Sequence, residues 1–336
     1  MQIFKNANYD FIKWRWHALL LSSAVIIGGF VLMLVRGGIP MGIDFTGGTI
    51  VVVKFEQKVS DETVRKALDA LPGEKVVQQY GDPAINEVLI RFPQVQAQEQ
   101  GFGLEGNSQK ALSALRAANV GKFEVISTEV VGPVVGADLQ RKGLYATIAS
   151  IFGLSIYIAF RFRFIFAVGA LVATFHDIFV VLALMGFLGY ELSLNVVAAI
   201  LTISGYSVND TIVVFDRVRE NMKLMRREPL DQIVNASVNQ TLGRTIITST
   251  TTFLAVLALY LFGGEVLRGF AFAMLVGVVT GTYSTVFIAA TIAIILSRRE
   301  KSARGGAPAK PAIAEGAPTA ATPAKPRKPG RNVRVS

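Results

Sequence analysis

The sequence predicts an α-helical membrane protein with six transmembrane helices and a small α+β domain inserted between the first and second helices. Hydrophobic residues make up 51% of the 336 residues, and several apolar runs exceed the roughly 18 residues that indicate a membrane span. Between the first two runs, residues 37–136 have the mixed composition of a soluble domain. The chain contains no cysteine, which excludes disulfides, zinc–thiolate sites and a thiol nucleophile.

The first predicted span, His17–Val35, follows three basic residues, the nearest of which is Arg15. Positive residues mark the cytoplasmic side of a membrane helix. Residues 1–36 are therefore expected to form a cytoplasmic amino terminus and the first transmembrane helix. The domain of residues 37–136 is then expected on the outer side of the membrane.

Residues 37–136 show the order strand, helix, strand, strand, helix, strand. The β-branched segment Thr49–Phe55 predicts the first strand, and Ser60–Leu71, with a serine cap and helical apolar spacing, predicts the first helix. The other elements are predicted at Lys75–Tyr80, Asn86–Phe92, Ser108–Asn119 and Lys122–Val131. This is the ferredoxin-like, split βαβ order. The domain has no histidine and no nucleophile–base pair, which favours a binding or lever domain over an enzyme. The glycine-rich Gly42–Gly48 is interpreted as a tight entry to the first strand.

Residues 137–297 are expected to form a bundle of five further spans. They are predicted at Leu139–Phe160, Phe164–Leu188, Leu192–Phe215, Thr241–Phe262 and Gly269–Leu296. The basic links 161–163 and 216–228 fall on the side of the amino terminus, so both termini are expected in the cytoplasm. Residues 298–336 hold most of the surplus positive charge among scattered prolines. They predict a disordered basic tail whose cations could touch anionic lipid headgroups.

The fourth predicted span carries a charge inside it, Asp210. An ionised aspartate at the centre of a transmembrane helix costs about 2.5–3.5 kcal/mol on insertion scales, so it needs a partner, a proton or a water-filled path. Ser207 lies one turn before it on the same stripe. The bland alternative is that Asp210 is merely solvated in the headgroup zone.

Arg244, at the entry to the fifth span, is the expected partner of Asp210, and Thr248 follows it one turn later. A nearby arginine favours the ionised carboxylate, whereas burial favours the protonated one. A pair that opens and closes is therefore a proton switch in principle. A static ion pair that fixes helix packing is an equally good interpretation.

His176 and Asp177 lie near the middle of the third predicted span. Both are costly at bilayer depth and suggest a relay or a gate, with a structural hydrogen-bonding role as the alternative. Adjacent helix positions point about 100° apart, so the two are not expected to bond each other. A metal site is disfavoured because the pair has no companion ligands.

Small residues recur every four positions in the sixth predicted span. They are Ala273, Gly277, Gly281 and Thr285. Such a face lets two helices approach closely, so it predicts helix packing.

Six motifs together resemble the SecF family, the smaller partner in the SecD–SecF protein-export accessory complex. They are Gly42-Ile-Asp-Phe-Thr-Gly-Gly48, Val131-Gly-Pro-Val-Val-Gly136, His176-Asp177, Gly205-Tyr-Ser-Val-Asn-Asp-Thr-Ile-Val-Val-Phe-Asp-Arg217, Thr241-Leu-Gly-Arg-Thr245 and Gly281-Thr-Tyr-Ser284. The resemblance covers the chain up to about Arg299 and leaves out the tail.

The resemblance implies a six-helix half of an RND-type assembly in the bacterial cytoplasmic (inner) membrane, with a periplasmic ferredoxin-like domain. The resemblance implies four partners: a separate SecD, the SecYEG channel, an unfolded preprotein and YajC. Membrane lipids surround the complex, and no specific nucleic acid is expected. Protons serve as the coupling ion, and no other cofactor, metal or catalytic motif is expected. The matching residues place the proton path at Asp210 and Arg244. Secondary candidates from the polar pattern are His176, Asp177, Ser207 and Thr248.

Two other functions remain open at this point. A half-size RND-type small-molecule exporter would need a substrate cleft in the outer domain, whose sequence shows no aromatic-lined pattern. A structural scaffold subunit would use Asp210 and Arg244 as a static tie without proton coupling. Neutralising Asp210 and Arg244 together distinguishes a scaffold from a proton-coupled subunit. A scaffold tolerates the double change, whereas a proton-coupled subunit does not.

Overall fold

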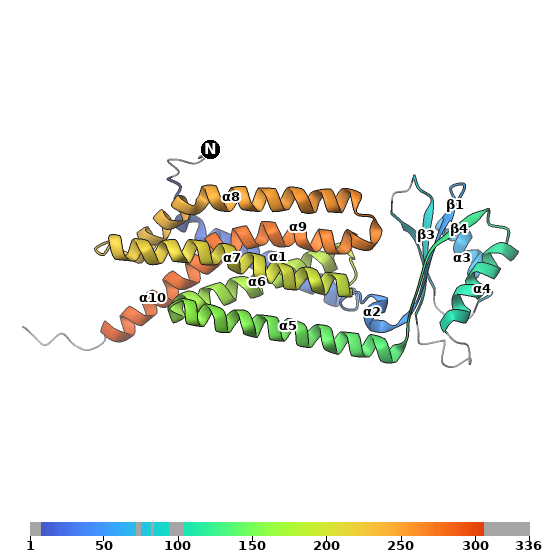
Figure 1. Cartoon of the computed structure of the whole chain (residues 1–336), viewed down its shortest axis with the longest axis horizontal. Coiled ribbons are helices and arrows are strands. Elements are labelled where there is room, and N and C mark those ends of the chain that lie inside the picture. The colour runs from blue at the N-terminus through green and yellow to red at the C-terminus, as the bar shows by residue number, and fades with distance from the viewer. Residues whose placement is uncertain (1–7, 72–74, 82–83, 94–103, 306–336) are drawn as a thin grey trace, which may run out of the picture. The chain divides into compact units, whose positions relative to one another are not determined.

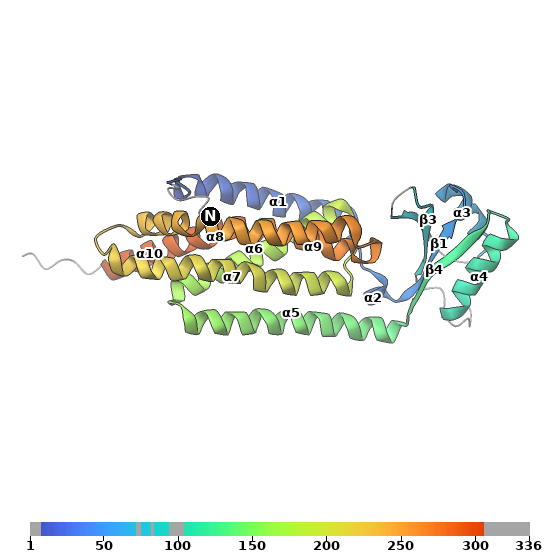
Figure 2. The same cartoon turned by 45° about the horizontal axis from the view of Figure 1, so that its top comes forward.

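The computed structural model describes residues 8–71, 75–81, 84–93 and 104–305. Within them, six helices are long and apolar enough to cross a membrane. Figures 1 and 2 show these long helices running side by side. They are α1 (Arg15–Val35), α5 (Pro133–Arg161), α6 (Phe164–Leu188), α7 (Leu194–Leu224), α8 (Leu230–Phe262) and α9 (Glu265–Ser284), which continues through a π-helical turn (Thr285–Ala289) into α10 (Ala290–Gly305). The six predicted spans are confirmed.

Two of these helices extend well past their predicted ends. Helix α7 has 31 residues and α8 has 33, although about 20 suffice to cross the hydrocarbon core. Polar pairs hold the extensions together: the Asn221 amide donates to Ser237 Oγ and to Gln240 Oε1, each at 2.8 Å. The predicted link of residues 216–228 is therefore mostly helix.

The predicted tail also begins as a helix. Helix α10 runs on to Gly305, because the residues before that glycine are good helix formers. Residues 298–336 form a unit of their own, and the expected disorder of residues 306–336 lies outside the described residues.

The inserted domain, residues 48–131 and here called the sheet domain, has the predicted order of elements. They are β1 (Gly48–Phe55), α3 (Asp61–Leu68), β2 (Val76–Tyr80), β3 (Glu87–Pro93), α4 (Leu104–Ala117) and β4 (Phe123–Val131). The strands are ordered β2-β3-β1-β4, and every neighbouring pair is antiparallel. The ferredoxin-like arrangement is confirmed.

Alternation along β1 builds the core of the sheet domain. Val51, Val53 and Phe55 point to the face that carries α3 and α4 and are fully buried there. Ser60 caps α3, since its hydroxyl accepts a hydrogen bond from Thr63 N at 3.2 Å.

The entry to β1 is a one-turn helix, α2 (Ile43–Thr46), rather than only a tight turn. Gly47 and Gly48 follow it with φ of 71° and 139°. This backbone region favours glycine, which explains the glycine pair before the strand.

The small-residue face of the sixth span packs against α7, as predicted. A Cβ at Gly277 would lie 2.4 Å from Ile203 side-chain atoms, and one at Gly281 would lie 3.1 Å from Ser207 Cβ. Only glycine permits this approach of α9 to α7.

Replacing Gly277 by valine is expected to lower the free energy of unfolding by about 1–3 kcal/mol, because the added atoms overpack the α7–α9 contact. Thermal unfolding of the purified protein in detergent measures this. Gly153→Ala on α5 is the control, since a Cβ there meets nothing within 4 Å. Equal melting temperatures for the two variants would contradict this packing.

Candidate functional site

Asp210 lies inside α7 and faces α8. At 1.5 Å per residue it is roughly 24 Å along the helix from Leu194. Its Oδ1 accepts a hydrogen bond from Thr245 Oγ1 of α8 at 2.8 Å. Its Oδ2 is buried and has no hydrogen-bond partner among the described residues. Asp210 is thus a half-satisfied carboxylate, meaning that only one of its two oxygens has a hydrogen-bond partner in the part of the chain that the structure describes. A carboxylate in this position within a membrane helix can both gain and release a proton.

Arg244 precedes Thr245 on α8 and is exposed. Among the ion pairs of the described residues, none joins it to Asp210, although it is near enough to act on that carboxylate electrostatically. Thr248 is also exposed and donates to Arg244 O within its own helix at 2.9 Å. The direct partner of Asp210 is thus Thr245, and its pairing with Arg244 stays a prediction.

A second carboxylate, Asp177, joins three helices. It is 1% exposed. Its Oδ2 accepts hydrogen bonds from Ser207 Oγ of α7 at 2.5 Å and from Ser284 Oγ of α9 at 2.7 Å. Its Oδ1 lies 3.0 Å from His176 Nδ1. All of these groups are buried, so Asp177 is the polar centre of the packed bundle.

The prediction that His176 and Asp177 do not bond each other is wrong. Ser207 of α7 and Ser284 of α9 hold the Asp177 carboxylate in place. Nδ1 is the imidazole nitrogen nearer to the histidine backbone, so it can reach the carboxylate of the next residue. The His176 ring also stacks on Tyr283 at 6.2 Å between ring centroids. His176 Nε2 is buried without a hydrogen-bond partner among the described residues.

Ser207 is buried one turn before Asp210 on α7. Its hydroxyl donates to Asp177 of α6. One turn later on α7, Thr211 lies 2.9 Å from Thr285 in hydroxyl–hydroxyl contact. Thr285 opens the π-helical turn of α9, and such turns occur often at functional sites. Ser207, which bonds to Asp177, and Asp210 therefore lie on adjacent turns of α7.

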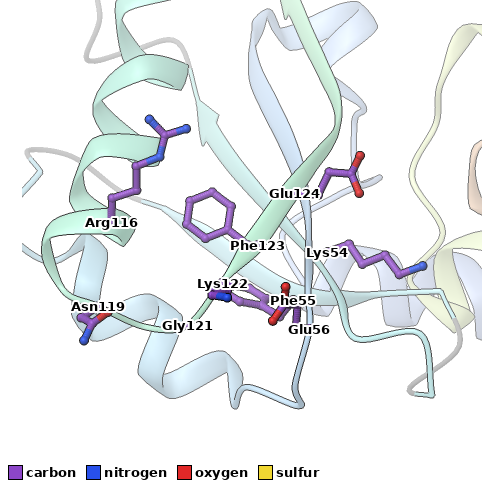
Figure 3. A pocket seen from close by; sticks show the side chains of 9 residues that line it. All are labelled: Lys54, Phe55, Glu56, Arg116, Asn119, Gly121, Lys122, Phe123 and Glu124. Carbon is purple, nitrogen blue, oxygen red and sulfur yellow. The ribbon is translucent and has the colours of Figure 1, made fainter.

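The sheet domain has a hollow of about 580 Å³ lined by β1, the end of α4 and the start of β4. Figure 3 shows Arg116 and Phe123 on one side of it, with the Arg116 guanidinium 6.0 Å from the ring centroid. Phe55 lies 5.7 Å from Phe123, between ring centroids. Charged residues form much of the lining, so the hollow is not the apolar cleft that a small-molecule exporter would need.

The sequence reasoning missed Thr245 and Ser284. Thr245 is adjacent to Arg244, but the helix rotation that turns it toward α7 is not visible in one sequence. Ser284 stands within a motif used only for the resemblance. Among the described residues, no group of three or more His, Asp or Glu side chains could hold a metal ion.

Known proteins match most of the chain. The family model of the SecD/SecF protein export membrane protein C-terminal region matches residues 110–299, and the SecD/SecF GG motif matches residues 31–59. The protein translocase subunit SecF of Gemmatimonas aurantiaca is 44% identical, over 89% of this chain and 90% of the relative. That of Escherichia coli O157:H7 is 37% identical, over 87% and 89%.

The crystal structure of SecDF, a translocon-associated membrane protein from Thermus thermophilus, superposes with a TM-score of 0.78 at 35% identity. The match covers 89% of this chain and 40% of that one. Six spans and a ferredoxin-like insertion define a multi-pass membrane protein, and the matching family models place it in the protein-export class. The chain belongs to the SecF family of protein translocase subunits.

Proposed function

We propose that the protein couples the proton gradient to preprotein movement, as the SecF half of a complex with SecD beside the SecYEG channel, with YajC as a further partner. The chain spans less than half of the SecDF chain that it matches, which supports a separate SecD partner. The bacterial SecF relatives support an inner-membrane location. The charge bias of the loops supports cytoplasmic termini and a periplasmic sheet domain.

The observation that carries this proposal is the half-satisfied Asp210 carboxylate between α7 and α8. Protonation removes its charge and with it the attraction to Arg244. One charge crossing 100 mV yields about 2.3 kcal/mol, which is enough to bias two arrangements of neighbouring helices. The Thr245 bond offers a neutral partner in one arrangement, and Arg244 offers a charged one in the other. Asp210 and Arg244 are thus the proposed proton path, with His176 and Asp177 as a secondary relay and protons as the only cofactor.

The rival is a structural subunit in which Asp210 and Arg244 only fix the packing. The double variant Asp210→Asn/Arg244→Gln separates the two. Proton coupling predicts that gradient-dependent export fails although no unpaired charge remains in the bundle. Export of a secreted reporter, with the membrane level of the variant measured alongside, makes the test. Normal export at a normal level would establish the scaffold instead.

A further inference from the structure

A short segment before β1 fastens the sheet domain to the start of α7. Gly42 N donates to Leu192 O at 2.8 Å, and Leu192 N donates to Pro40 O at 2.7 Å. Met41 and Leu192 form a parallel β-bridge. Residues 40–46, here called the clamp, are therefore paired with the residues that lead directly into α7.

Asp44 closes this clamp from its one-turn helix. Its Oδ2 accepts a hydrogen bond from Leu194 N, the first residue of α7, at 2.8 Å. The first N–H groups of a helix lack partners within the helix, and the end of the helix dipole there favours a negative charge. The side chain of the capping residue Ser193 accepts a long hydrogen bond, from Val196 N at 3.4 Å. Asp44 thus caps this helix from another segment of the chain. Its hydrogen bond is shorter than that of Ser193, and its negative charge interacts favourably with the helix dipole.

The clamp also packs closely against the start of α5, the helix by which the chain leaves the sheet domain. A Cβ at Gly136 on α5 would lie 3.1 Å from Gly47 N and from Phe45 O. A Cβ at Gly42 would lie 3.1 Å from Leu192 O. The backbone is therefore closely packed at both ends of α2, and we expect the clamp to move together with α7.

An ion pair adds a second tie at the same end of α7. Arg91 on β3 is bonded to Glu191, in the turn before α7, and their side chains are 15% and 32% exposed. Arg91 stands on the sheet face opposite to α3 and α4, because its neighbour Ile90 belongs to the core on the helix side. The Asp44 bond thus reaches the first residue of α7, and the ion pair reaches the turn before it. Helix α7 is also the helix that carries Ser207 and Asp210.

We propose that the clamp transmits displacements of α7 to the sheet domain, and that Asp44 is the positioning residue that holds it closed. This inference rests on the proposed function, since a displacement of α7 has to originate at Asp210. Asp44 contacts the first residue of α7, roughly 24 Å along the helix from Asp210, so we expect it to act through that helix end. Its loss therefore uncouples the sheet domain while the proton site stays intact.

The first test compares Asp44→Ala with Asp210→Asn and with Asp69→Ala, an exposed aspartate of the sheet domain that serves as control. Gradient-dependent export should fall about tenfold in Asp44→Ala, the factor carried by a capping interaction of about 1.4 kcal/mol, and stay normal in Asp69→Ala. Normal export by Asp44→Ala beside failed export by Asp210→Asn would overturn the clamp alone. Normal export by Asp210→Asn would overturn the proposed function.

A reversible cross-link gives the second test, because the chain has no cysteine of its own. Bridged residues on neighbouring strands are about 4.8 Å apart, within the range that a disulfide spans. Met41→Cys/Leu192→Cys should form a disulfide quickly in the wild-type background and more slowly with Asp44→Ala, a readout independent of export. Once formed, the disulfide should restore export by Asp44→Ala, and a reductant should abolish that rescue. Failure to rescue, or loss of export in the cross-linked wild-type background, would overturn the clamp.

Discussion

An Asp210→Asn variant is expected to reach the membrane at the normal level and to lose the gradient-dependent part of export. Asparagine has the size of aspartate, and its amide oxygen still accepts the Thr245 hydrogen bond seen at 2.8 Å. It takes up and releases no proton and carries no charge for Arg244. The bias of about 2.3 kcal/mol per charge at 100 mV, roughly a 40-fold preference between helix arrangements, disappears. Pulse-labelling of a secreted reporter in cells measures the accumulated precursor.

Thr202→Val on the same helix is the matched control for this experiment. Thr202 is exposed and donates only to Ala198 O of its own helix, so its loss leaves export unchanged. Normal export by Asp210→Asn would leave a subunit whose buried charge serves packing. Attention would then pass to His176 and Asp177 as the proton-carrying groups.

Replacing Asp177 by alanine is expected to be the most destabilising single change in the bundle. It leaves the hydroxyls of Ser207 and Ser284 and the Nδ1 of His176 without their acceptor in a region closed to water. Removing one member of a buried charged group costs about 3–5 kcal/mol. Thermal unfolding in detergent should show this loss, together with a lowered membrane level.

Asp177→Asn is the informative companion of that variant. Its amide oxygen still accepts from the serines, so it should lose clearly less stability than the alanine variant. If Asp177→Asn is stable but blocks gradient-dependent export, Asp177 belongs to the proton relay. If it is stable and exports normally, Asp177 has a structural role. Wild-type stability of Asp177→Ala would contradict the role of this carboxylate in joining α6, α7 and α9.

Periodicity explains what the sequence revealed about the fold. Six long apolar runs leave few alternatives to membrane helices, and the β-branched residues of Thr49–Phe55 predict a strand. They do not show which face of that strand is buried, because Val51, Val52 and Val53 are alike in the sequence and all three are buried. Helix ends were less accessible. The extensions of α7 and α8 depend on pairs such as Asn221 with Ser237, which form only when two helices already lie side by side.

The candidate site shows the same limit. A charge within an apolar run singles out Asp210 and Asp177, because burying a charge is costly in any fold. Which hydroxyl meets which carboxylate depends on the rotation of each helix about its axis. Thr245 and Thr248 are therefore equivalent in the sequence, while the fold turns only Thr245 toward Asp210. Ser207 lies one turn before Asp210 in the sequence, and only the fold shows that its hydroxyl donates to Asp177 of another helix.

If Asp210 couples the proton gradient to preprotein movement, as proposed, the rate of translocation has to depend on both. Translocation of a labelled preprotein into inverted membrane vesicles is measured with the gradient intact and after an ionophore collapses it. We expect a faster rate with the gradient for the wild-type protein. For Asp210→Asn we expect equal rates in both conditions, matching the wild-type rate without a gradient. If the gradient accelerates the variant as strongly as the wild type, Asp210 does not couple the gradient to export.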